Sequence, residues 1–330
     1  MISMISRHGK ARKKNNIIRA AAVLTAALIL ITTFAGCFGG KDDGIVRVMQ
    51  FNIKVGNAES VAPRVSGLKK LIEERDPDII GFQEVTTAWR EQLDKKVLTK
   101  KWAGVGELRR EGEEATPVYY RKDKFKLLDS GTFWLSPSPD VPASSFEGAN
   151  YPRIASWAQL QNKKTGYVFV HLNTNLDHHG DNDSATAREI RTAQTEVLLR
   201  FIDSLGDVPV IMTGDFNQAM SSSKGNFYKP YKLIVGMDEL SLADGSTVKM
   251  NFLNTRLTAK QTVDGDRIAT MVKSYDESST SYDPAKQPID YVFYTEGDYE
   301  ALLYSTFMPL VDGVEVSDHL GLYCELKISP

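Results

Sequence analysis

The chain has 330 residues and a mass of 36.7 kDa, with 42% hydrophobic and 25% charged residues. This apolar content can build a sizeable core, which excludes disorder as the main state, and 24 glycines with 13 prolines are too few for a collagen-like or low-complexity chain. Two cysteines cannot form a disulfide scaffold or a four-cysteine zinc site.

The first 36 residues have the composition of a secretory leader. Residues 1–19 hold six basic side chains and no acidic one, and residues 20–36 carry no charge. A basic stretch, an apolar stretch and small residues in that order are typical of a signal peptide. The 17 uncharged residues are fewer than the roughly 20 that span a bilayer, so the sequence favours a signal peptide over an uncleaved membrane anchor. Both place the main domain outside the cytoplasm.

The segment Ala35-Gly36-Cys37 resembles a bacterial lipobox. The resemblance implies an extracytoplasmic lipoprotein that is anchored to the membrane through lipid on Cys37. Residues 37–44 then form a polar tether, and residues 45–330 form one domain, which we expect to be a monomer. Since Cys37 is used by lipid, Cys324 has no partner and is expected to be a buried packing residue.

The charge balance shifts when the leader is set aside. Residues 37–330 hold 34 basic and 42 acidic side chains, a net charge of −8. No global positive field therefore attracts nucleic acid or anionic lipid. If the substrate is anionic, a bound cation must supply much of the local attraction. Residues 95–126 are locally basic and could face phosphate, although a solvated helix and hairpin are the favoured explanation.

Strand-like and helix-like segments alternate along the rest of the chain. Apolar and β-branched runs predict strands at 45–52, 78–84, 117–121, 126–135, 155–161, 167–173, 208–213, 289–294 and 320–327. Apolar side chains at helical spacing predict helices at 63–74, around 89–97 and at 185–205. Alternating strands and helices indicate an α/β protein, and the lack of a long linker favours one domain.

Polar residues gather at the ends of these strands, where ligands bind in layered α/β folds. They are Asn52, Glu84, Asp215, Asn217, Asp290, Asp318 and His319. Burying an unpaired carboxylate costs several kcal/mol, so the acids among them imply either buried ion pairs or a shared metal. An oxygen-rich set favours Mg²⁺ or Mn²⁺ over zinc. Each residue alone has a structural explanation, such as a turn or a surface pair, but their joint appearance is more specific.

Seven motifs in this order resemble the endonuclease/exonuclease/phosphatase superfamily. They are Phe51-Asn52-Ile53, Gly81-Phe82-Gln83-Glu84-Val85, Thr132-Phe133-Trp134-Leu135-Ser136, Asn173-Thr174-Asn175-Leu176-Asp177-His178, Gly214-Asp215-Phe216-Asn217, Ile289-Asp290-Tyr291-Val292-Phe293 and Ser317-Asp318-His319. The resemblance implies an α/β (α+β) fold class, a four-layer α/β sandwich in which two packed mixed β-sheets are flanked by helices.

The resemblance also implies a role for each matched residue. Glu84 would be the main metal ligand, with Asn52 beside it. Asp215 would orient or deprotonate the attacking water, and Asn217 would hold a phosphoryl oxygen. Phosphodiester hydrolysis needs an activated water, neutralisation of the developing oxygen charge and help for the leaving group, and such groups supply these.

The remaining roles concern the histidine side of the site. Asp318 would position His319, which would stabilise the phosphoryl group or move a proton, and Asp290 would assist at the metal or the histidine. Family members commonly have a second catalytic histidine where this chain has Asn175. An Asn donates a hydrogen bond but cannot take a proton, so we expect a slower reaction. His171, on the strand predicted at 167–173, and His178 are the two histidines that could compensate, although we expect a packed or hydrogen-bonded role for His171 and a loop position for His178.

Two further residues are candidates for contact with substrate. Arg153 matches a family position that faces the substrate, and a surface ion pair is its equally simple explanation. Tyr119 and Tyr120 alternate along a strand, so at most one of them faces the cleft, and we assign Tyr119.

The sequence therefore predicts an enzyme, a Mg²⁺-dependent (or Mn²⁺-dependent) phosphoric ester hydrolase acting on phosphodiester or phosphomonoester bonds. An extracytoplasmic nuclease with nucleic acid as its partner is placed slightly ahead of a sphingomyelinase-like enzyme or a sugar- or inositol-phosphate phosphatase. A catalytically silent binding module on the same fold is the alternative from another class, and Asn175 is its only support. The identity of the substrate does not follow from the sequence.

Overall fold

The computed structural model describes residues 44–178, 184–222, 224–263, 269–271 and 288–329, which belong to one compact unit. The predicted leader, Cys37 and the tether up to residue 43 lie outside the described residues. Within the described ranges, no helix has the length and hydropathy needed to cross a membrane.

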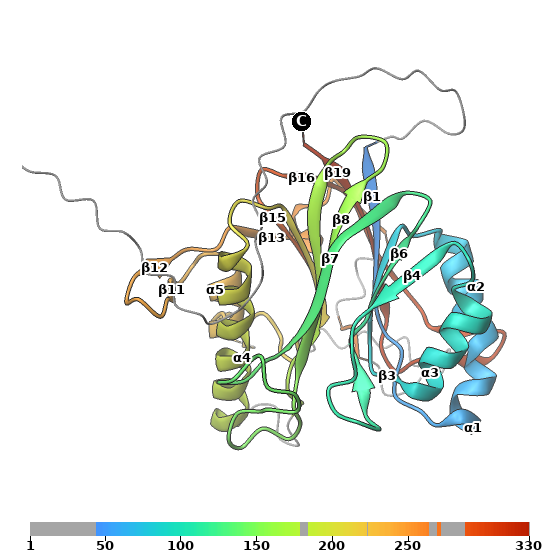
Figure 1. Ribbon diagram of the computed structural model, residues 1–330, viewed down its shortest axis with the longest axis horizontal. Helices are drawn as coiled ribbons and strands as arrows, with labels where there is room; N and C mark the ends of the chain where they lie inside the picture. The colour runs from blue at the N-terminus through green and yellow to red at the C-terminus, as the bar shows by residue number, and fades with distance from the viewer. Residues whose placement is uncertain (1–43, 179–183, 223, 264–268, 272–287, 330) are drawn as a thin grey trace, which may run out of the picture. The chain divides into compact units, whose positions relative to one another are not determined.

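Two mixed β-sheets form the centre of this unit (Figure 1). The first sheet has the strand order β14 (Gln261–Val263), β16 (Tyr299–Phe307), β19 (Gly321–Ile328), β1 (Ile45–Asn52), β2 (Ile79–Gln83), β6 (Val118–Arg121), β4 (Trp102–Val105). The second has the order β13 (Phe252–Asn254), β15 (Asp290–Thr295), β10 (Val210–Asp215), β9 (Val168–Asn175), β8 (Ile154–Asn162), β7 (Phe125–Trp134). Smaller two-stranded sheets pair β3 (Val85–Thr86) with β5 (Glu114–Ala115), β11 (Leu240–Ser241) with β12 (Thr247–Val248), and β17 (Leu310–Val311) with β18 (Val314–Glu315).

Helices cover the outer faces of both sheets, which gives four layers (Figure 1). The first sheet carries α1 (Ala58–Val61), the 3₁₀ turn η1 (Ala62–Arg64), α2 (Val65–Arg75), α3 (Thr87–Gln92) and the π-helical η2 (Leu93–Val97). On the second sheet lie α4 (Ala185–Ser204) and α5 (Lys229–Ile234), and the short α6 (Thr255–Thr258) follows β13. The predicted α/β sandwich of two packed mixed sheets flanked by helices is confirmed.

Each strand predicted from the sequence has a counterpart whose ends differ by up to two residues. The long strand β16 was missed. Its pairing with β19 shifts register between Ala301 and Leu303, and this bulge breaks the alternation of buried and exposed side chains by which a strand is recognised.

The face between the two sheets changes from apolar to polar along the strands. Val46 and Val48 of β1 belong to the apolar core that the two sheets share. Because strand side chains alternate, Asn52 lies on the same face four residues further on. In β10, Ile211 belongs to that core and Asp215 follows on its face in the same way. The hydrophobic end holds the sheets together, and the polar end is left for a site.

Candidate active site

Three polar side chains form one row across adjacent strands of the second sheet. Asn175 of β9 pairs with Asp215 of β10 in parallel register, and Asp215 pairs with Asp290 of β15 in antiparallel register. Each is at most 2% exposed. Strand register therefore brings together residues that are far apart in the sequence, on the face that meets the first sheet.

His319 reaches this row from the segment before β19. Its Nδ1 lies 2.9 Å from Asp290 Oδ2, and its Nε2 lies 3.9 Å from Asp215 Oδ2. Ser317 fixes the segment, because its Oγ donates to Asn52 O at 2.6 Å and accepts from His319 N at 3.1 Å. The ligand atoms of Asp215, Asp290 and His319 all lie within 4.8 Å of one another.

Asp318 does not position His319. Its carboxylate pairs with Lys54 Nζ at 3.1 Å, and about a third of its side chain is exposed. Asp290 holds the imidazole instead, because strand pairing places it beside Asp215, whereas Asp318 points towards the surface. This corrects the expectation from the sequence, which took the neighbouring residue in the chain as the orienting acid.

Glu84 and Asn52 lie at the ends of the two central strands of the first sheet. Asn52 Nδ2 donates to both Glu84 Oε1 and Asp215 Oδ2 at 3.0 Å, so it links two carboxylates. Glu84 Oε2 accepts from Val55 N at 2.8 Å. Glu84 has a φ of +61°, in the left-handed region that costs a non-glycine residue about 1–3 kcal/mol and is often kept at functional sites.

Asn217 has a similar backbone conformation, with a φ of +49°. Its backbone N–H donates to Asp215 Oδ1 at 2.9 Å, and its Nδ2 donates to Leu176 O at 3.0 Å. The turn after β10 thus fixes the carboxylate of Asp215 and brings the amide of Asn217 to the same row.

Arg153 is buried, so the surface ion pair considered for it is excluded. Its Nη1 lies 3.2 Å from Glu114 Oε1. With the Asn175 amide turned so that its oxygen faces Arg153, Nη1 donates to Asn175 at 3.2 Å. The Nε of Arg153 has no hydrogen-bond partner within the described residues and lies 3.8 Å from Asp177 Oδ1. A guanidinium therefore borders the position where the family commonly has its second histidine.

Tyr119 is not brought to the site. Its ring packs against Phe82 in the core between the first sheet and its helices, and its hydroxyl donates to Asp94 at 3.0 Å. Strand alternation turns this side chain away from the second sheet. The assignment of Tyr119 as a substrate contact is therefore not supported.

Burial and neighbouring charges shift the pKa values of Asp215 and His319. Burial, followed by the repulsion of Asp290, raises the pKa of Asp215 to about 7. Burial alone would lower the pKa of His319, but the carboxylates of Asp290 and Asp215 outweigh it and raise this pKa to about 10. At neutral pH the imidazole is therefore protonated, and it is the one cation in direct contact with these carboxylates among the described residues.

The donor set fits a divalent cation. Glu84, Asp215 and Asp290 are three acids gathered around one imidazolium, and a buried excess of negative charge is costly unless a cation neutralises it. Carboxylate and amide oxygens are the ligands that Mg²⁺ and Mn²⁺ prefer. The residues that could hold the ion are Glu84 and Asn52, with Asp215 beside them.

A set of buried polar residues behind the row was not predicted from the sequence to take part in the site. They are Gln50, Gln83, Asn173 and Thr213, all fully buried. The signal that could have found them is strand alternation, since Gln50 lies two residues before Asn52, and Asn173 lies two before Asn175.

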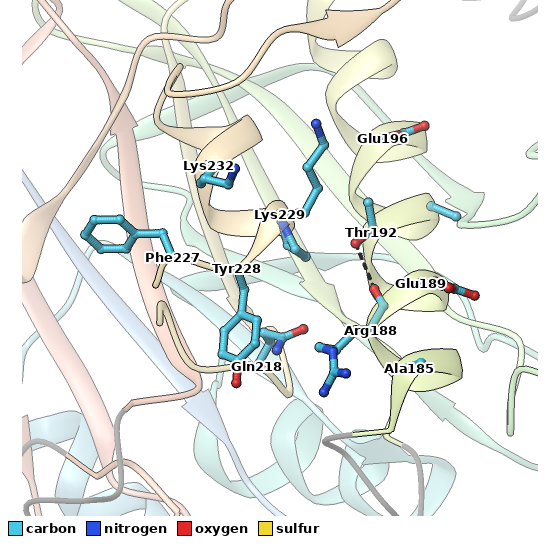
Figure 2. A pocket seen from close by; sticks show the side chains of 12 residues that line it. Ala185, Arg188, Glu189, Thr192, Glu196, Gln218, Phe227, Tyr228, Lys229 and Lys232 are labelled. Carbon is cyan, nitrogen blue, oxygen red and sulfur yellow. Dashed lines mark hydrogen bonds between the residues drawn. The ribbon is translucent and has the colours of Figure 1, made fainter. Parts of the chain in front are cut away.

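A cavity of about 660 Å³ opens between α4 and α5 (Figure 2). Gln218, which directly follows Asn217, lines it together with Tyr228. Side chains of both charges form its walls, namely Arg188, Glu189, Glu196, Lys229 and Lys232. The two lysines pair with Asp238 at 3.1 and 2.9 Å. The cavity is large enough for a small molecule.

The fold is an α/β sandwich of two packed mixed sheets. Acids, amides and an imidazole gather at one end of it, and this combination defines a class of proteins that includes phosphoester hydrolases. This chain belongs to the Endonuclease/Exonuclease/phosphatase family, which its sequence matches over residues 49–319. No curated protein matches it significantly in sequence.

Solved structures agree with this assignment. A family protein from Bacteroides vulgatus is 26% identical, with a TM-score of 0.68 over 86% of this chain and 99% of its own. A mannosyl-6-phosphatase from Bacteroides thetaiotaomicron is 23% identical, with a TM-score of 0.64 over 85% and 99%. The human nocturnin catalytic domain with bound sulfate is 18% identical, with a TM-score of 0.61 over 86% and 94%. The last two likenesses concern the fold.

Proposed function

We propose that this chain is a Mg²⁺-dependent phosphoesterase that works outside the cytoplasm and cleaves phosphodiester bonds, with nucleic acid as the leading substrate class. The observation that carries the proposal is the junction of Asn52 with Glu84 and Asp215, which joins the two sheets beside the Asp290–His319 pair. Acid, amide and imidazolium groups then converge on one small volume. A silent binding module would have no need of this arrangement.

The cation is assigned to Glu84 and Asn52. When bound there, it would neutralise charge on a phosphoryl oxygen. Three carboxylates border this position, and Asn52 would offer its amide oxygen, which now accepts from Lys54 N at 3.0 Å, by turning its side chain. Glu84 is held for this task by its left-handed backbone and by the hydrogen bond from Val55 N.

The chain's own residues then account for the remaining steps. Asp215 accepts a proton from water as the water oxygen bonds to phosphorus and the bond from phosphorus to the leaving oxygen breaks. His319, protonated and held by Asp290, donates its Nε2 proton to the leaving oxygen or stabilises the phosphoryl oxygens. Asn217 donates its amide to a phosphoryl oxygen, and Arg153 contributes positive charge beside Asn175.

A sugar-phosphate phosphatase is the second candidate. The observation that favours it is the cavity between α4 and α5, which has the volume for a sugar and is lined by Gln218, Tyr228 and charged residues of both signs (Figure 2). The net charge of −8 outside the leader also weakens long-range attraction of nucleic acid.

The test is a substrate panel for the protein that lacks residues 1–36. Activity is measured with Mg²⁺ or with chelator on DNA, RNA, sphingomyelin vesicles, sugar phosphates and an aryl phosphodiester. We expect cleavage of at least one soluble phosphoester, loss of activity with chelator and loss of most activity in Asp215→Asn and His319→Ala. Full activity in both variants would overturn the assigned roles. A silent module would show no cleavage, and calorimetry would detect no Mg²⁺ binding if it has also lost the ion.

A further inference from the structure

A continuous set of buried side chains connects the Asp290–His319 pair to the interior between the sheets. Gln50 Nε2 donates to Asp290 Oδ1 at 2.8 Å and to Gln83 Oε1 at 2.7 Å. Gln83 Nε2 donates to Asn173 Oδ1 at 2.6 Å. Thr213 Oγ1 donates to the same oxygen at 2.9 Å. Asp290 is thus held from two sides, by His319 on one carboxylate oxygen and by Gln50 on the other.

The orientation of the Gln50 amide is set by Asp290. Both Nε2 hydrogens are used, whereas Gln50 Oε1 has no hydrogen-bond partner among the described residues. A buried acceptor without a partner costs about 1–3 kcal/mol. Turning the amide over would place its oxygen 2.8 Å from a carboxylate oxygen of Asp290, which is worse. The side chain leaves its own oxygen unsatisfied in order to donate to Asp290.

We propose that Gln50 is a positioning residue for the reaction: its amide fixes the Asp290 carboxylate in the plane in which the other oxygen binds His319 Nδ1. This inference rests on the proposed function. Among the described residues Gln50 has no hydrogen bond to His319, Glu84 or Asp215, so it acts through Asp290. An amide suits the position because it donates without adding another negative charge beside the carboxylates.

The activity test uses Gln50→Met, which keeps a similar volume and removes the donor. We expect kcat on an aryl phosphodiester to fall at least about tenfold with KM unchanged, as for other residues that orient catalytic groups. The same substitution in an Asp290→Ala background should change kcat less than twofold, because nothing is left to position. Equal losses of kcat in both backgrounds, or an unchanged kcat in Gln50→Met, would overturn the proposal.

A matched control is Thr213→Val. It removes the hydrogen bond from Thr213 Oγ1 to Asn173 Oδ1, at the end of the network away from Asp290. It should lower thermal stability while leaving kcat within twofold of the native value. If it lowers kcat as much as Gln50→Met does, the network acts only through stability and the proposal fails. If Gln50→Met does not fold, the double variant Gln50→Met/Gln83→Met, which removes both members of the Gln50–Gln83 hydrogen bond, must show a kcat at least about tenfold below the native value.

A second measurement does not depend on activity. The proton between His319 Nδ1 and Asp290 is followed by NMR and assigned by its absence in His319→Gln. In Gln50→Met it should move upfield and exchange faster with water, while Thr213→Val should leave it in place. An unmoved resonance in Gln50→Met contradicts the positioning role. If the native protein cleaves no phosphoester, the proposed function fails, and this measurement still decides whether Gln50 orients Asp290.

Discussion

His319 Nδ1 lies 2.9 Å from Asp290 Oδ2, although 29 residues separate the two in the sequence. Asp318, the immediate neighbour of His319, pairs with Lys54 instead. The two acids therefore differ in what they touch and in burial, since Asp290 is 1% exposed. Substituting Asp290 and Asp318 in turn therefore tests which of the two carboxylates orients the imidazole of His319.

Asp290→Asn is expected to lower kcat at least about 100-fold, because an amide neither fixes the imidazole tautomer nor stabilises its charge. Asp318→Asn should leave kcat within about threefold, since it removes an ion pair that is partly exposed. Steady-state kinetics on an aryl phosphodiester measures both. Comparable losses in the two variants would contradict the assignment of Asp290 as the orienting acid.

Removal of the Glu84 carboxylate should weaken cation binding. Glu84→Gln keeps the side-chain shape but loses the charge that a divalent ion needs, so we expect the Mg²⁺ affinity to fall at least tenfold. Titration calorimetry on the chelator-treated protein measures it, with Glu59→Gln, an exposed residue of α1, as the matched control. Native affinity in Glu84→Gln would show that the ion binds elsewhere.

Short-range patterns in the sequence allowed prediction of the strands and of the polar residues at their ends, whereas the sandwich fold and the residue roles followed from the resemblance to a known family. Asn52, Glu84 and Asp215 each end a strand whose apolar residues are evident, and strand ends meet at one edge. The pairing of Asp290 with His319 depends on the register of β10 with β15, and no local pattern reports it. Tyr119 shows the same limit, since alternation gives two faces but does not say which one meets the second sheet.

The close approach of the two sheets behind the site depends on Gly81 of β2. A Cβ at this position would lie 2.2 Å from Thr213 Oγ1 and 2.7 Å from Asn173 Oδ1. Gly81→Ala should therefore destabilise the protein by about 1–3 kcal/mol through overpacking. Urea unfolding measures the loss. Adding Thr213→Ala removes the nearest atom, so the combined loss should be smaller than the sum of the single losses; strict additivity would argue against the predicted clash.

The acid sensitivity of folding should come in part from His171. It is fully buried on β9, with Nε2 2.8 Å from Thr213 Oγ1, and burial lowers its pKa to about 3. The unfolded chain has a value of about 6.5, so between these two values the unfolded state binds the proton. The stabilising contribution of the neutral imidazole is complete above about pH 6.5 and is lost as the pH falls towards 3, by at most about 1.4 kcal/mol per pH unit.

His171→Gln removes this titration, and an amide can still donate to Thr213. The free energy of unfolding of the native protein should therefore fall relative to that of His171→Gln by about 2 kcal/mol between pH 7 and pH 5. Urea denaturation at a series of pH values, with chelator present in every sample, gives the difference directly. A difference that stays constant over this range would mean that His171 takes up its proton without unfolding, and that the interior behind the site admits water.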